Sequence, residues 1–154
     1  MRNLDIIILA NAGIMRATGY DLQPKEAYQF YLLKKQIEKA VSSIREAEGE
    51  FVKNAGIDNP EAFDSRTKEL SEKSELSKEE RKELDEHRST LDKLNEMRKA
   101  LYEDETDIKV KPISYDSWFK LQKENAKENI FGGNVEAILE NVFWSAPEEG
   151  EGNE

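Results

Sequence analysis

The sequence predicts a mainly α protein, organised as a long antiparallel two-helix hairpin (coiled-coil-like) with short flanking helices and one minor β element. Two long stretches carry apolar residues at heptad spacing, and one short stretch alternates apolar and polar residues. Of the 154 residues, 36% are charged and 37% are hydrophobic. Narrow apolar seams between solvated helix faces suit this composition better than one compact core.

The first long helix is expected to begin at Pro24 and to end near Gly56. Proline is tolerated at the first helical position because the N–H there has no partner within the helix. Glycine readily adopts the left-handed cap that ends many helices. Two sevenfold apolar rows form a seam of a and d positions, made of Phe30, Ile37, Ile44 and Phe51 in one row and Leu33, Ala40 and Ala47 in the other.

The second long helix is expected from Ser77 to about Tyr102. Ser77 and Glu80 have the spacing of a capping box, in which each side chain accepts from the backbone N–H of the other. The seam of this helix consists of Leu84, His87, Leu91, Leu94 and Leu101. Because neither stripe would be stable alone in water, we expect the two helices to pair along their seams.

The remaining elements are shorter. Residues 4–18 have helical spacing, although the β-branched run at 6–8 leaves a strand as the alternative. Asn59-Pro60-Glu61 can start a helix, and further short helices are expected at 114–123 and 134–143. Residues 107–113 alternate like a strand, and the neighbour of this strand can lie in the same chain or in a second copy.

We expect one elongated helical domain over residues 1–145 and a disordered acidic tail over 146–154. No stretch approaches the roughly 20 apolar residues of a membrane span. The apolar run at 6–10 is shorter than the core of a secretion signal. The chain has no cysteine, which fits a reducing cytoplasm.

The net charge of −10 limits the classes of partner. Nucleic acids and anionic membranes carry charge of the same sign, so electrostatics opposes direct binding to either. The expected partner is therefore a protein or a second copy of the chain.

The sequence predicts no catalytic residue, no metal ligand and no cofactor. Structural zinc sites need more Cys and His than this chain has, and the Glu-x-x-His pattern of di-iron bundles does not occur. His87 is the only histidine, and as a general base it would need a polar cleft and a positioned partner. A structural histidine on the second helix is the favoured interpretation, and a small enzyme that uses His87 is the alternative.

Aromatic residues gather near the C-terminus, where both tryptophans lie. They can pack the short C-terminal elements onto the hairpin. Alternatively, they can anchor a partner, since aromatic side chains dominate interface hot spots. The residues predicted to bind a partner are Trp118, Phe119, Phe143 and Trp144.

Several segments together give a resemblance to a known group of proteins. Pro24-Lys25-Glu26-Ala27-Tyr28 opens a long charged helix, a second helix ends at Leu101-Tyr102-Glu103, and the alternating stretch from Asp107 to Ser114 follows. This order over residues 20–120 resembles small helical proteins of unknown function encoded by tailed phages and prophages. The polar stretch at 57–76 and the longer aromatic C-terminus depart from that pattern. The resemblance implies a phage context and carries over no catalytic residue.

The function predicted from these observations is that of a non-enzymatic interaction protein, an assembly helper or adaptor in a phage. It would act in the cytoplasm of a bacterial host or in the virion. An acidic inhibitor of a host defence protein or of a nucleic-acid-binding protein is the second hypothesis. Affinity that falls as salt rises would distinguish this inhibitor from an assembly protein.

Overall fold

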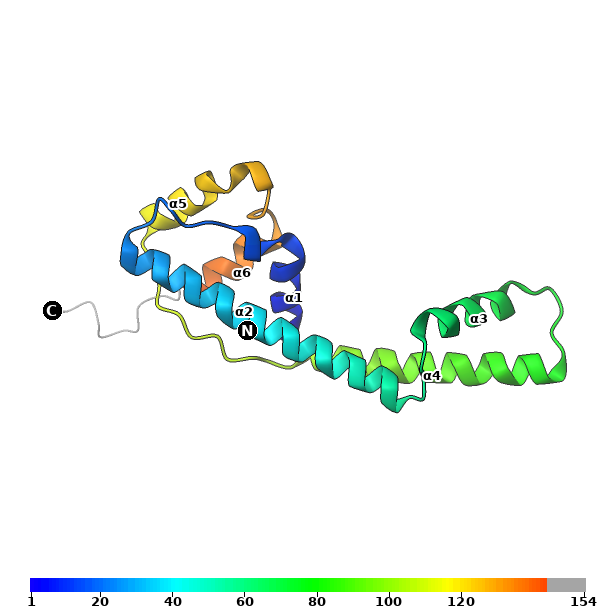
Figure 1. Ribbon diagram of the computed structural model, residues 1–154. Coiled ribbons are helices and arrows are strands. Elements are labelled where there is room, and N and C mark those ends of the chain that lie inside the picture. Colours follow the sequence, from blue (N-terminus) through cyan, green and yellow to red (C-terminus); the bar gives the residue numbers. More distant parts are fainter. Residues whose placement is uncertain (144–154) are drawn as a thin grey trace. The chain divides into compact units, whose positions relative to one another are not determined.

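The computed structural model describes residues 1–143, so the expected tail at 146–154 and Trp144 lie outside the described residues. The described chain is mainly helical, as the sequence predicts (Figure 1). Its elements are α1 (Asn3–Ala12), η1 (Ile14–Arg16), α2 (Pro24–Asn54), α3 (Pro60–Glu72), α4 (Lys78–Glu103), α5 (Tyr115–Glu124), η2 (Ala126–Glu128) and α6 (Asn134–Phe143).

The chain divides into two compact units where the sequence predicts one domain. The end unit contains residues 1–42 and the described residues from 105 onward, and the middle unit contains residues 43–104. The long helix α2 contributes its first part to the end unit and its last part to the middle unit. Each unit buries apolar side chains of its own.

Local sequence signals explain where the helices begin and end. Gly13 closes α1 with φ +93°, and Gly56 after α2 has φ +80°, so the expected left-handed cap at Gly56 is confirmed. Asn59 caps α3 by accepting from Ala62 N–H at 3.1 Å. The capping box between Ser77 and Glu80 is also confirmed.

The first part of the α2 seam is buried in the end unit. Phe30, Leu33 and Ile37 are at most 1% exposed. All three belong to the end unit, whereas α4 belongs to the middle unit. A heptad stripe specifies which face of a helix is buried and leaves open what covers it. The expected pairing of α2 with α4 along their whole length is therefore not confirmed.

In the middle unit, α3 packs against α4. Leu70 and Leu84 are buried at this contact, and Arg66 donates to both carboxylate oxygens of Glu83 at 2.9 and 3.0 Å. The hydrogen bonds with Arg66 lower the pKa of Glu83. Further seam residues of this unit, Phe51, Leu91 and Leu101, are only half-buried. Tyr102 donates to Glu48 of α2, and this hydrogen bond raises the pKa of the Tyr102 hydroxyl.

The contacts of Glu80 at the start of α4 are expected to depend on pH. The pKa of Glu80 is lowered to about 2, first by a hydrogen bond from Lys73 and then by the backbone N–H of Ser77. Because the folded-state pKa lies below the ordinary value of 4.5, these contacts stabilise the cap above that value and are lost as the pH falls toward 2. We expect an NMR titration to place the Glu80 midpoint well below 4.5. Lys73→Gln should return the midpoint toward the ordinary value, and a wild-type midpoint at that value would contradict the contact.

The strand expected at 107–113 does not form. The only β-bridge among the described residues joins Arg2 and Glu105, and residues 107–113 run extended without a ladder. Residues 6–9 belong to helix α1, so they cannot serve as a neighbouring strand. Instead, side-chain amides of α2 bind the segment: Gln36 pairs with both backbone groups of Lys109, and Gln29 accepts from Lys111 N–H.

Candidate protein-binding surfaces of the end unit

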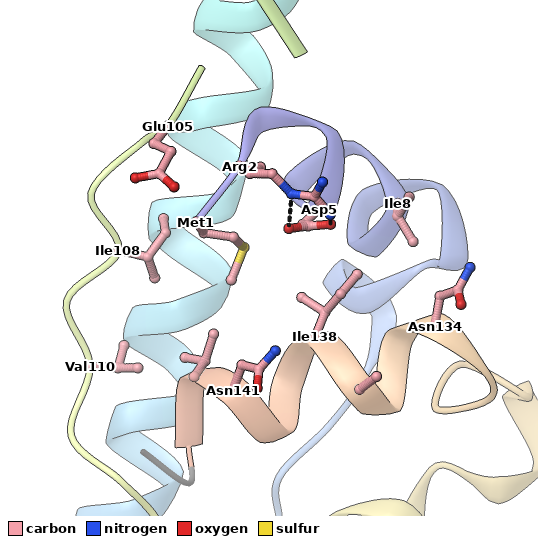
Figure 2. Close-up of a pocket in the computed structure, with 12 residues that line it drawn as sticks. Met1, Arg2, Asp5, Ile8, Glu105, Ile108, Val110, Asn134, Ile138 and Asn141 are labelled. Carbon is pink, nitrogen blue, oxygen red and sulfur yellow. Dashed lines mark hydrogen bonds and ion pairs between the residues drawn. The ribbon is translucent and has the colours of Figure 1, made fainter. Parts of the chain in front are cut away.

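A groove of about 840 Å³ lies in the end unit between α1, α6 and the extended segment at 105–110 (Figure 2). Its apolar lining comprises the side chains of Met1, Ile8, Ile108, Val110, Ala137, Ile138 and Val142. Drug-sized ligands and peptide side chains bind in concave sites of this size. The groove is therefore the first candidate for a binding surface.

Helix α6 lines the groove because it is apolar on two faces. Val135, Leu139 and Phe143 recur every four residues and are buried in the core. Ile138 and Val142 share a second face with Asn134 and Asn141, and this face lines the groove (Figure 2). A helix with only one apolar face would present a fully polar wall at this position.

One end of the groove is closed by polar contacts. Arg2 donates to both carboxylate oxygens of Asp5 at 3.1 and 3.0 Å, and the hydrogen bond with Asp5 raises the pKa of Arg2. The Met1 ammonium donates to Thr106 O at 3.0 Å, while Thr106 N–H donates back to Met1 O at 2.9 Å. These contacts attach the N-terminal residues to the start of the extended segment.

Exposed aromatic side chains on three segments of the end unit are the second candidate for partner binding. On α2, the rings of Tyr28 and Tyr31 stack with centroids 6.4 Å apart. On α5, Tyr115 and Phe119 are 71% and 58% exposed and lie one helical turn apart. Tyr20, in the loop before α2, is 87% exposed. The sequence does not single out Tyr20, Tyr28 or Tyr31 as binding residues. Tyr28 and Tyr31 lie outside the heptad positions of the α2 seam, however, and this spacing alone indicates that they face away from the seam.

Two of the four residues predicted to bind a partner belong to the core. Trp118 is 3% exposed and meets Phe131 edge-on at 5.8 Å between ring centroids. Phe143 is fully buried, and its ring centroid lies 6.4 Å from that of Trp118. Neither ring can reach a partner in this structure, so these two assignments are corrected. Phe119 is exposed, and Trp144 lies outside the described residues.

His87 is a half-buried residue at the contact of α3 and α4. Its ring stacks on Phe63 with centroids 4.2 Å apart, and its Nδ1 lies 2.8 Å from the Thr67 hydroxyl. The Thr67 hydroxyl also lies 2.9 Å from Phe63 O, to which it donates. These contacts hold α3 against α4.

Among residues 1–143, no group of three or more His, Cys, Asp or Glu side chains is arranged to hold a metal ion. In the same part of the chain, no helix has the length and apolar character needed to cross a membrane.

Comparison of the chain with protein-family models, curated proteins and solved structures found no match. The interpretation of the two surfaces therefore depends on their own geometry.

Proposed function

We propose that the chain is a non-enzymatic interaction protein that binds a protein partner through its end unit. One observation carries this proposal: within residues 1–143, every large hydrophobic side chain that is exposed lies in the end unit, namely Leu4, Met15, Tyr20, Tyr28, Tyr31, Tyr115 and Phe119. Exposed apolar residues that gather on one part of a molecule are typical of protein–protein interaction sites. Tyrosine is also enriched among the residues that dominate binding energy.

The partner surface is expected to be mainly apolar. The described residues of the end unit carry as many Lys and Arg side chains as Asp and Glu side chains, so the net charge of −10 comes from the middle unit and from residues 144–154. The aromatic contacts would therefore supply most of the affinity, and individual ion pairs beside them would help to select the partner.

We place this activity in a tailed phage or prophage, as that of an assembly helper or adaptor. The order of elements over residues 20–120, which resembles small phage-encoded proteins, supports this context. The protein would then act in the bacterial cytoplasm or in the virion.

Site-specific photo-crosslinking tests the proposal. A photoreactive phenylalanine analogue is placed at Tyr31, at Phe119 and, as the control, at Lys99, which is exposed in the middle unit. In cells that produce the chain, we expect both aromatic positions to capture the same protein and the control position not to capture it. Capture from Lys99 alone, or none from the other two positions, would refute binding through the end unit.

The identity of the captured protein decides between the two functional hypotheses. A virion or assembly protein would support the adaptor role. A basic nucleic-acid-binding protein, held by a complex that weakens as salt rises, would instead support the acidic inhibitor.

A further inference from the structure

The loop between η1 and α2 contains a tight turn with an aromatic residue at its centre. Leu22 N–H donates to Gly19 O at 3.3 Å, so Tyr20 and Asp21 are the two central residues of the turn. The turn lies close to α2, because a Cβ on Gly19 would stand 3.2 Å from the Phe30 ring. Tyr20 is 87% exposed, the largest fraction among the exposed large hydrophobic side chains of residues 1–143. The turn therefore presents the ring of Tyr20 to solvent.

Two consecutive residues at the end of α5 hold the backbone of this loop. Asn125 Oδ1 accepts from Thr18 N–H at 2.9 Å, and Asn125 Nδ2 donates to Thr18 O at 2.8 Å. Glu124 Oε1 accepts from Tyr20 N–H at 2.8 Å. The backbone of the exposed residue is thus attached directly to a helix.

The two flanks of the loop are also fixed. Ala17 and Leu22 are 1% and 7% exposed, so the chain is packed on both sides of the turn. Lys34 of α2 donates to Ala17 O at 2.9 Å. A loop whose conformation is already set loses little conformational entropy when it binds, and this increases the affinity that an exposed side chain on it can supply.

The other carboxylate oxygen of Glu124 indicates that stability alone does not account for this residue. Within residues 1–143, Glu124 Oε2 is shielded from solvent and accepts no hydrogen bond. A shielded polar atom without a partner lowers stability, and an apolar side chain of similar size is often no worse for stability at such a position. Residues that reduce stability in this way are typical of functional sites.

We propose, on the basis of the function proposed above, that Tyr20 is the anchor residue through which the end unit binds its protein partner, and that Glu124 holds it in position. A ring that projects from a turn needs a concave complement. The partner therefore carries a pocket with apolar walls and a polar group at its base for the phenol hydroxyl. The turn at 19–22 carries Asp21 and neither lysine nor arginine, so a nucleic acid would meet like charge there.

Crosslinking from position 31 tests the anchor. The photoreactive analogue stays at Tyr31, and the chain is produced at a low level, so that the yield of captured protein follows affinity. Tyr20→Ala should lower this yield about tenfold or more, as the loss of an anchor residue does. Tyr20→Phe keeps the ring and should retain most of the yield. Asp21→Ala, the matched control in the same turn, should change it by less than about twofold.

The outcomes separate this inference from the proposed function. Capture from Tyr31 that Tyr20→Ala leaves unchanged would overturn the anchor alone. No capture from Tyr31 or Phe119 in the otherwise unchanged chain would refute binding through the end unit, and the anchor with it. A captured species that nuclease digests would identify a nucleic acid and overturn the protein pocket.

Variants of Glu124 test whether it positions the anchor. Glu124→Leu removes the acceptor for Tyr20 N–H and should lower the crosslinking yield several-fold, while the thermal unfolding midpoint stays the same or rises. Glu124→Gln keeps an acceptor for this N–H and should keep the yield. Circular dichroism measures the midpoint of each variant. An unchanged yield in Glu124→Leu, or a midpoint that falls by several degrees, would overturn the positioning role.

Discussion

Replacing Ile37 by aspartate is expected to unfold the end unit. Ile37 is fully buried on the seam of α2. An aspartate there would place a carboxylate among apolar side chains, which costs several kcal/mol even after local relaxation. Since whole domains are stable by roughly 5–15 kcal/mol, this one change removes most or all of that margin. Urea unfolding, followed by circular dichroism and by tryptophan fluorescence, would measure the loss.

The matched control for this substitution is Ser42→Asp, which adds the same charge to an exposed position of α2. Its effect on the free energy of unfolding should stay within about 0.5 kcal/mol. Leu91→Asp provides a further comparison because Leu91 is only half-buried and lies in the middle unit. It should destabilise the protein less than Ile37→Asp does. Equal effects of Ile37→Asp and Ser42→Asp would show that the α2 seam is not the core of the end unit.

The helices were predictable because their signals are local. Proline at the start of α2, the Ser77–Glu80 box and the glycine after α2 all act within a few residues of the helix ends. The covering of the α2 seam depends on segments distant in the sequence, and a heptad pattern carries no information about them. The second helix has a similar seam, so the pattern alone predicts that the two helices pair as a single hairpin.

The expected strand failed for a related reason. Alternation correctly indicated an extended segment at 107–113, but it could not identify what binds the backbone. The side chains that do so are Gln29 and Gln36, which look like ordinary solvent-exposed residues in the sequence of a charged helix. Polar side chains that bind the backbone of another segment need not recur at a regular spacing, so no periodic pattern in the sequence identifies them.

The candidate binding residues were only partly predictable. Consecutive residues on a helix lie about 100° apart, so Trp118 and Phe119 must point in different directions. Leu121 lies three positions after Trp118 and identifies the buried face, while Tyr115 lies four positions before Phe119 on the exposed one. A helical wheel would have separated the two faces of α5. The burial of Phe143 depends on how α6 packs, which local sequence does not specify.

Asn125→Leu is expected to be the second most destabilising change. Asn125 is 3% exposed and joins the end of α5 to the loop before α2. Its Oδ1 accepts from Thr18 N–H at 2.9 Å, and its Nδ2 donates to Thr18 O and Leu121 O, both at 2.8 Å. Leucine has a similar size but leaves the N–H and C=O of Thr18 without this partner, while Leu121 O keeps its hydrogen bond from the backbone N–H of residue 125. An unsatisfied buried group costs about 1–3 kcal/mol, so we expect a loss of about 2–4 kcal/mol in urea unfolding.

Two further variants separate the hydrogen bonds of Asn125 from its packing. Asn95→Leu makes the same replacement at an exposed position of α4 and should change stability by less than about 0.5 kcal/mol. Asn125→Asp keeps the acceptor for Thr18 N–H but directs a carboxylate at two carbonyl oxygens. Such a carboxylate has a raised pKa in the folded state, so the stability of this variant relative to the wild type should increase as the pH falls and the protonated group donates. If Asn125→Leu behaves like Asn95→Leu, the amide does not hold the loop, and apolar packing alone must connect Thr18 to α5.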